Sequence, residues 1–102
     1  MVIVQGVFWV DPDQVAAFVE GRKATMDASR DDRGCLEYVF AADPLTPGRV
    51  ILSERWESRQ ALEEHGAAGR ARAEAAGHPA PAVEPLRREI VAYEVSDSWP
   101  LG

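Results

Sequence analysis

Residues 34–65 constrain the fold more than any other part of the chain. Their sequence, GCLEYVFAADPLTPGRVILSERWESRQALEEH, predicts a strand over 35–42, a second strand over 50–56 and then a helix capped by Ser58. The loop between the strands contains two prolines and a glycine and has the length of a hairpin connection. Strands joined by such a loop pair most simply as antiparallel neighbours. The segment therefore predicts the centre of an antiparallel sheet with a helix attached to it.

The residues before this segment predict a strand followed by a helix. Residues 2–10 are rich in Val, Ile, Phe and Trp and are apolar on both faces, as in a strand that is buried on both sides. Asp11 can cap the helix that follows, and Pro12 fits its first position. The apolar face of this helix consists of Val15, Phe18, Val19 and Met26. The helix should end in the turn-forming sequence DDRG, at Gly34.

The residues after it predict more helix and a fourth strand. Gly66 interrupts the helical pattern, and residues 67–76, rich in alanine and arginine, predict a further helix. Residues 78–85 contain three prolines and predict an irregular connection. Residues 88–95 predict the fourth strand, and residues 96–102 form a tail beyond a single domain of residues 1–95.

The resulting order, β-α-β-β-α-α-β, is close to a ferredoxin-like α+β domain with a four-stranded antiparallel sheet. Helices would cover one face of this sheet. Apolar strand residues would remain on the other face whichever register the strands take. A large exposed apolar sheet face usually marks an interface, so the sequence predicts a homodimer through the sheet face.

Composition narrows the possible partners and location. The net charge of −6 argues against nucleic acid and against an anionic membrane surface. No apolar run approaches the roughly 20 residues of a membrane span, and the apolar N-terminus lacks a basic leader and a cleavage site. Cys35 is the only cysteine, which suits a reducing compartment. We therefore expect a cytoplasmic protein.

His65 is the first candidate for chemistry. A neutral imidazole could accept a proton from an acidic phenol or enol near neutral pH. The alternative is a histidine at the C-terminus of a short helix, where it interacts with the helix dipole. No metal-site spacing is present, because His65 and His78 are thirteen residues apart and Cys35 is remote from both. The sequence also lacks a phosphate-binding loop, so it predicts no metal and no cofactor.

Three other residues are candidates for substrate binding. Trp56 and Glu54 share one face of their strand, so Trp56 could form an aromatic wall of a pocket or fill the core. A buried Glu54 would need a partner, and the expected structure is an ion pair. Its candidate partners are Arg22, Arg55 and Arg88. The Tyr38 hydroxyl could contact a ligand, or its ring could lie in an interface.

The segments GCLEYVFAADP and VILSERWESRQALEEH resemble the antibiotic biosynthesis monooxygenase domain family, and the similarity extends over residues 2–95. The family pattern is a Gly-Cys strand, an E-x-W strand end and an A-L-x-x-H helix. The matching residues are Gly34, Cys35, Glu54, Trp56, Ala61, Leu62 and His65.

The resemblance implies a dimeric α+β barrel with a pocket between helices and sheet in each subunit. Some members of the family oxidise quinols or polycyclic phenols with molecular oxygen and without metal, flavin or haem, because the deprotonated substrate supplies the electrons. On this interpretation His65 would hold or deprotonate a hydroxyl of a small aromatic substrate. Trp56 would line the pocket, Tyr38 would contact the substrate, and Glu54 is a further substrate-binding candidate.

The chain also departs from the family pattern. A second histidine often follows the A-L-x-x-H histidine, but HGAAGRARAEAAG has arginines and alanines there. The haem-degrading branch uses an asparagine on the first strand and a histidine on the last helix, whereas this chain has no asparagine. Two alternatives therefore stay open: a barrel that binds a small ligand without oxygen chemistry, and an accessory subunit whose tail, including Trp99, fills the space beside His65.

Overall fold

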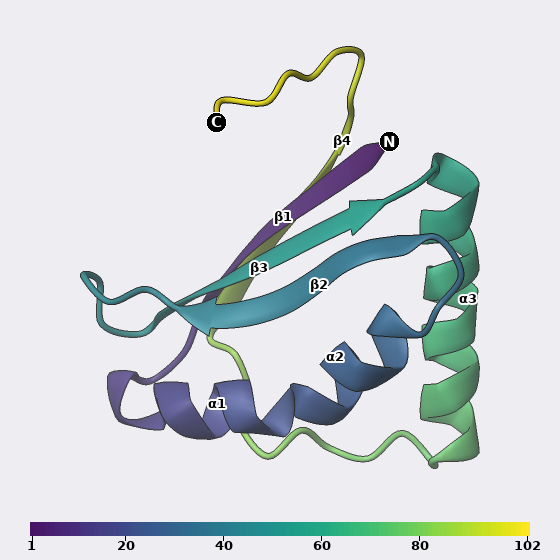
Figure 1. Cartoon of the computed structure of the whole chain (residues 1–102). Coiled ribbons are helices and arrows are strands. Elements are labelled where there is room, and N and C mark those ends of the chain that lie inside the picture. Colours follow the sequence, from purple (N-terminus) through teal and green to yellow (C-terminus); the bar gives the residue numbers. More distant parts are fainter.

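A four-stranded antiparallel sheet with helices on one side forms the fold, as the computed structural model of all 102 residues shows (Figure 1). The strands are β1 (Val2–Trp9), β2 (Cys35–Ala42), β3 (Arg49–Trp56) and β4 (Arg87–Glu94). Their order in the sheet is β2-β3-β1-β4, and each neighbouring pair is antiparallel. The predicted α+β fold and hairpin are confirmed.

The helices differ from the prediction in where they break. The first helical region consists of a 3₁₀ turn (Pro12–Gln14), α1 (Val15–Gly21) and α2 (Lys23–Arg30). Its break falls at Arg22, which directly follows Gly21, a residue of low helix propensity. The second region is one helix, α3 (Arg59–Ala75), so the predicted interruption at Gly66 is wrong. A single glycine within a long helix costs only about 1 kcal/mol, which does not end the helix.

Side-chain caps start both helical regions as the sequence predicts. The Asp11 Oδ1 accepts a hydrogen bond from the backbone N–H of Asp13 at 2.9 Å. The Ser58 Oγ accepts one from the backbone N–H of Ala61 at 3.1 Å. Each bond satisfies a donor that would have no partner within the helix.

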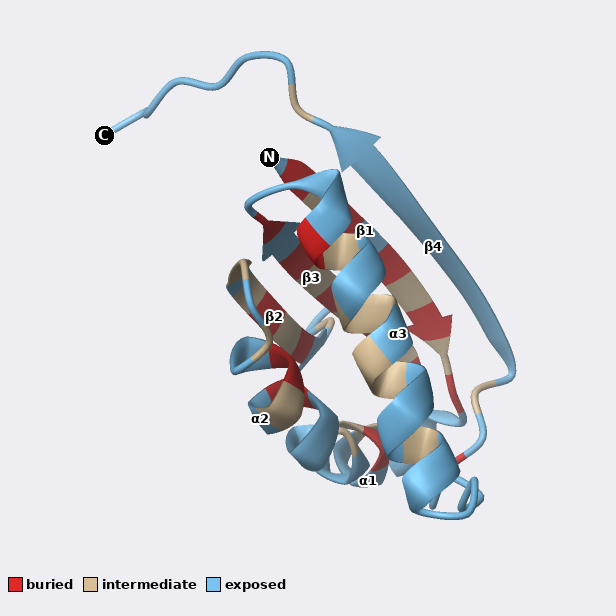
Figure 2. Ribbon diagram, turned by 90° about the vertical axis from the view of Figure 1, so that its right-hand side faces the viewer, coloured by how far each residue is buried: buried red, intermediate tan, exposed pale blue.

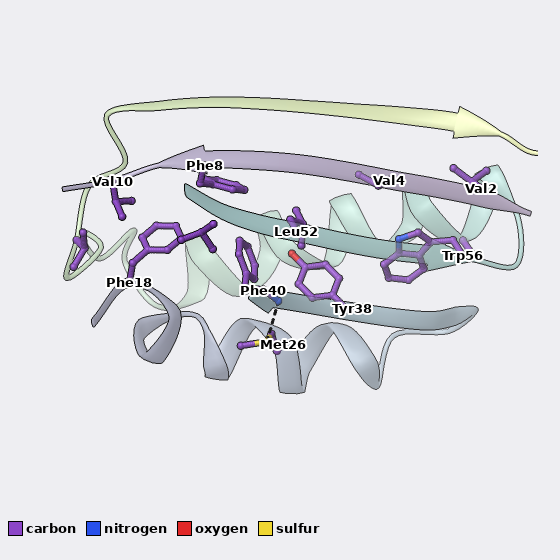
Figure 3. Packing of buried hydrophobic residues seen from close by; sticks show 13 residues of the cluster. Val2, Val4, Phe8, Val10, Phe18, Met26, Tyr38, Phe40, Leu52 and Trp56 are labelled. Carbon is purple, nitrogen blue, oxygen red and sulfur yellow. Dashed lines mark hydrogen bonds between the residues drawn. The ribbon is translucent and has the colours of Figure 1, made fainter. Parts of the chain in front are cut away.

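The core lies between the helices and one face of the sheet (Figure 3). Three phenylalanines form its centre: Phe8, Phe18 and Phe40 have ring centroids 5.3–6.1 Å apart. The other buried hydrophobic residues are Val2, Val4, Val10, Met26, Tyr38, Val50, Leu52, Trp56, Ala61 and Val83. The period of two along a strand places the core residues of each strand on one face.

The opposite face of the sheet is not covered by any helix. It carries Ile3, Val7, Trp9, Val39, Ile51, Val91 and Tyr93, which are half-buried or exposed. β4 is exposed along its whole length, and Figure 2 shows it at the outer edge of the sheet. The sequence thus correctly predicted an apolar sheet face without a partner inside the chain.

Residues 96–102 contain no helix or strand and extend away from the sheet (Figures 1 and 2). Trp99 is 73% exposed in this tail. No helix is both long and apolar enough to cross a membrane.

Gly34 fixes the closest approach between the sheet and α3. It adopts a φ of +82°, and a Cβ at this position would lie 2.5 Å from the Cβ of Ala61. Its carbonyl also accepts a hydrogen bond from the Glu57 backbone N–H at 2.9 Å. The start of β2 and the first turn of α3 therefore touch only because residue 34 has no side chain.

Gly34→Ala should destabilise the fold by about 2 kcal/mol or more, because it adds both backbone strain and a steric clash. Gly77→Ala is the matched control, since Gly77 has a φ of +77° but nothing within 4 Å of the added Cβ. That control should cost only about 1 kcal/mol. Urea denaturation followed by circular dichroism measures both values, and equal losses would contradict the proposed close contact.

Candidate functional site

An open cleft of about 1060 Å³ lies on the helical side of the molecule. Its walls come from α1 and α2, from α3, from residues 78–86, which connect α3 to β4, and from the first two residues of β4. Tyr38 lines it from β2, and His65 and Arg72 line it from α3. Two of the predicted site residues, Tyr38 and His65, therefore reach the same cleft.

His65 lies in the middle of α3, so its interpretation as a helix C-terminal histidine is wrong. Its side chain is 15% exposed. The imidazole packs against Trp56 with a centroid distance of 4.5 Å and against Tyr38 with a centroid distance of 5.5 Å. The two aromatic rings restrict the orientation of the imidazole, which also borders the cleft.

Asp32 completes the site around His65. Its Oδ2 lies 2.8 Å from the His65 Nδ1, and Arg72 donates to both of its oxygens at 3.1 Å. The hydrogen bonds from Arg72 are the largest cause of the lowered pKa of Asp32. Burial acts in the opposite direction, and the hydrogen bond with His65 lowers the pKa further. Asp32 is therefore ionised at neutral pH and can only accept hydrogen bonds.

The geometry assigns the proton positions on His65. Because Asp32 is an acceptor, the Nδ1 of His65 carries a proton in the neutral ring. The Nε2 then carries the lone pair, and no group of the chain forms a hydrogen bond with it. Asp32 and His65 form a carboxylate–imidazole dyad, an arrangement that suits a general base.

The sequence did not indicate Asp32 or Arg72 as site residues. Asp32 lies in the turn before β2, where its backbone N–H donates to the Ser29 carbonyl and its own carbonyl accepts from the Cys35 N–H. The DDRG sequence indicated only the turn. A signal for Arg72 was available, because it follows His65 by about two helical turns and so lies on the same face of α3.

Glu54 and Trp56 lie behind His65 and do not line the cleft. Both are buried, with exposed fractions of 5% and 0%. The Trp56 Nε1 donates to the Glu54 Oε1 at 2.9 Å. The predicted ion pair of Glu54 with an arginine is therefore wrong. Strand alternation directs Arg55 to the opposite face of the sheet, where it pairs with Glu37 at 3.1 Å.

Burial raises the pKa of Glu54, while the indole N–H of Trp56 and the nearby His65 act in the opposite direction. Burial and then the charge of Glu54 raise the pKa of Tyr38 to about 12, with the nearby hydroxyl of Ser29 opposing the shift. The Tyr38 phenol is thus protonated near neutral pH, so it can donate a hydrogen bond and cannot act as a base.

No group of three or more His, Cys, Asp or Glu side chains is arranged to hold a metal ion. The charged and titratable groups that the chain places at the cleft include the Asp32–His65 dyad and the arginines that line the walls.

A model of the antibiotic biosynthesis monooxygenase family matches residues 1–76. The chain belongs to this family. The match covers β1 to the end of α3, and so it includes Asp32, His65 and Arg72. The family resemblance seen in the sequence is confirmed.

Several solved structures share the whole fold. A Deinococcus radiodurans protein named as a candidate antibiotic biosynthesis monooxygenase is 27% identical, with a TM-score of 0.77, and the similarity covers 100% of this chain and 99% of that one. The haem degrader MhuD of Mycobacterium tuberculosis, solved with two haems in its active site, is 21% identical, with a TM-score of 0.74 and coverage of 98% and 100%. At 21% identity, the likeness to MhuD shows the fold alone.

Among curated proteins, the uncharacterised protein sll1783 of Synechocystis is 30% identical over 64 residues. The aligned segment is 63% of this chain and 44% of sll1783, so it spans less than half of that relative.

The buried carboxyl of Glu54 should make the stability of this family member depend on pH. Folding raises the pKa of this carboxyl. The free energy of unfolding should therefore fall as the pH rises from the pKa of Glu54 in the unfolded chain to its pKa in the folded chain. Glu54→Gln removes the charge and keeps an acceptor for Trp56. The variant should be more stable than wild type above the folded pKa of Glu54, and the advantage should shrink below the ordinary glutamate pKa of about 4.3.

Thermal denaturation of both proteins across this pH range measures the effect. Glu74→Gln, which removes an exposed carboxylate from α3, should leave the profile unchanged. An equal profile for Glu54→Gln and wild type would show that Glu54 carries no buried charge.

Proposed function

We propose that the chain is a cofactor-independent monooxygenase that oxidises a small quinol or polycyclic phenol with molecular oxygen. The observation that carries the proposal is the Asp32–His65 dyad beside the cleft, with the Nε2 of His65 left without a partner. Membership of the antibiotic biosynthesis monooxygenase family supports the general reaction type.

In this reaction the Nε2 of His65 accepts the proton of a substrate hydroxyl. Asp32 accepts the Nδ1–H and stabilises the imidazolium that forms, and Arg72 keeps Asp32 ionised. The aromatic anion is electron-rich and transfers electrons to oxygen. The O–O bond then breaks. One oxygen atom replaces a ring hydrogen as a carbonyl, and the other leaves as water with that hydrogen and the proton that His65 had accepted, so the substrate is the only reductant.

The remaining predicted site residues take different roles in this proposal. Tyr38 donates a hydrogen bond to the substrate from the cleft wall. Trp56 lies on the far side of His65 and fixes the plane of its ring, and Glu54 holds the indole through the 2.9 Å hydrogen bond. Trp56 and Glu54 are therefore positioning residues rather than substrate contacts.

The alternative is a barrel that binds a small aromatic ligand without oxidising it. It is favoured by α3, which carries arginines and alanines after His65 where relatives often carry a second histidine. The accessory-subunit alternative loses its main support, because Trp99 of the tail is exposed and does not line the cleft. A cytoplasmic location stays a prediction from the sequence.

His65→Ala should lower the rate of oxygen uptake with a panel of quinols and phenols by about 10²–10⁴-fold, the usual contribution of a general base. Asp32→Asn should lower it by about 10- to 100-fold, because the amide no longer fixes the imidazole tautomer. Asp31→Asn, the exposed neighbour, is the matched control and should retain full activity.

An oxygen electrode measures these rates, and thermal-shift binding of the same compounds under nitrogen separates the two functions. Compounds that bind under nitrogen and are never oxidised in air would favour the binding protein. Oxidation at the wild-type rate by His65→Ala would overturn the role of the dyad. A haem titration followed by its Soret band is a further arm, and a specific 1:1 complex would point to haem chemistry instead.

We also propose that two copies pair through the uncovered sheet face to form a homodimer. The apolar residues on this face, with polar neighbours such as Gln5 and Ser53, suit an interface of standard size, about 1,200–2,000 Å² in total. β4 lies at the edge with Val91 and Tyr93 about half exposed, at 48% and 51%. Pairing would remove these side chains from water.

Val91→Lys should shift the protein from dimer to monomer without unfolding it, because Val91 is already exposed in the single subunit. Leu45→Lys is the matched control, since Leu45 is 89% exposed in the loop between β2 and β3, away from this face. Sedimentation velocity at micromolar concentration measures the result. A monomeric wild type would contradict the dimer.

A further inference from the structure

The cleft is positively charged although the chain as a whole has a net charge of −6. Four arginines line it, at positions 22, 72, 87 and 88, and Glu84 is the only acidic residue among the lining residues. A concentration of one sign of charge in a cleft raises the local concentration of ligands of the opposite sign. The excess of arginine therefore favours an anionic ligand in the cleft.

Two of these arginines already have carboxylate partners. Arg72 makes two hydrogen bonds to Asp32, and Arg87 lies 3.9 Å from the Glu89 carboxylate. Arg22 and Arg88 form no ion pair within the chain, and Glu84 acts on Arg22 only over a longer distance. Two guanidinium groups at the cleft are thus free to receive an anion.

Arg22 is held in place by aromatic rings rather than by a carboxylate. Its guanidinium carbon lies 4.8 Å from the ring centroid of Phe18, and 5.6 and 5.9 Å from those of Phe40 and Phe8. Partial burial lowers the pKa of Arg22, and the charge of Arg88 acts in the same direction. The group still stays charged, because an arginine in a protein does not lose its proton.

Ser29 also lines this cleft, but its Oγ is fully buried. Buried hydroxyl groups almost always have a hydrogen-bond partner. The Tyr38 hydroxyl is near enough for Ser29 to oppose the rise in the pKa of Tyr38, so it is the natural partner. The groups left to bind an anion are therefore Arg22 and Arg88.

We propose that the ligand of this cleft is an aromatic carboxylate, whose carboxylate is bound by Arg22 and Arg88 while its ring hydroxyl lies at His65. The planar fork of a guanidinium matches a carboxylate, and the stacked rings orient Arg22 before binding. The proposal rests on the proposed function only for the role of the hydroxyl. Binding of the carboxylate needs no oxygen chemistry.

The test compares 6-hydroxy-2-naphthoate with its methyl ester, which have the same ring and hydroxyl and differ in charge. Titration calorimetry under nitrogen measures both dissociation constants. Wild type should bind the acid about tenfold or more tightly than the ester, as expected for a charge-assisted hydrogen bond. Arg22→Met keeps apolar contact with the phenylalanines and should abolish most of this preference.

Arg88→Gln provides a second variant on an exposed strand position, where folding is not at risk, and should lower the preference at least threefold. Lys23→Gln is the matched control, because Lys23 is an exposed cation that pairs with Glu20 and does not line the cleft. The Lys23→Gln protein should prefer the acid over the ester by the same factor as wild type.

The outcomes separate this inference from the monooxygenase proposal. Equal affinity for acid and ester, or a preference that survives both arginine variants, would overturn the carboxylate site even if quinols are oxidised. A preference that depends on Arg22 or Arg88 supports the site even if the oxygen electrode detects no turnover.

Discussion

The carboxylate of Asp32 joins the two parts of the molecule that make the site. It lies in the turn between α2 and β2, and it accepts hydrogen bonds from His65 and Arg72 on α3. These three hydrogen bonds, two of them from the charged Arg72, stabilise the ionised form of the carboxylate. Together with the packing of His65 against Trp56 and Tyr38, this network fixes the position of the middle turns of α3.

Strand alternation supplies the second constraint. It places Tyr38, Glu54 and Trp56 on the helical face, where Trp56 packs against His65 and Tyr38 reaches the cleft. The same alternation leaves apolar residues such as Val7 and Ile51 on the face that has no helix. One geometric rule therefore generates both the site and the proposed dimer surface.

The position of Arg22 has a consequence for binding. Arg22 lies between α1 and α2, and its guanidinium lies over the phenylalanine cluster of the core. It follows Phe18 by four residues, a spacing that puts both side chains on the same face of a helix. This spacing helps to place the cation that we propose binds the substrate carboxylate.

By itself the sequence determined the strands, the hairpin, the helix caps and the apolar sheet face, because local propensity and a period of two or 3.6 residues decide these features. It also pointed to His65 through the motif around it. Only the tertiary structure decided which groups meet His65. Asp32 is distant from His65 in the chain, and Glu54 takes its hydrogen bond from Trp56 rather than from an arginine. The Asp32–His65 pair depends on how α3 crosses the sheet, and no local pattern encodes that crossing. The Glu54–Trp56 pair lies within β3, but only the burial of both side chains in the folded chain makes it the partner that Glu54 uses.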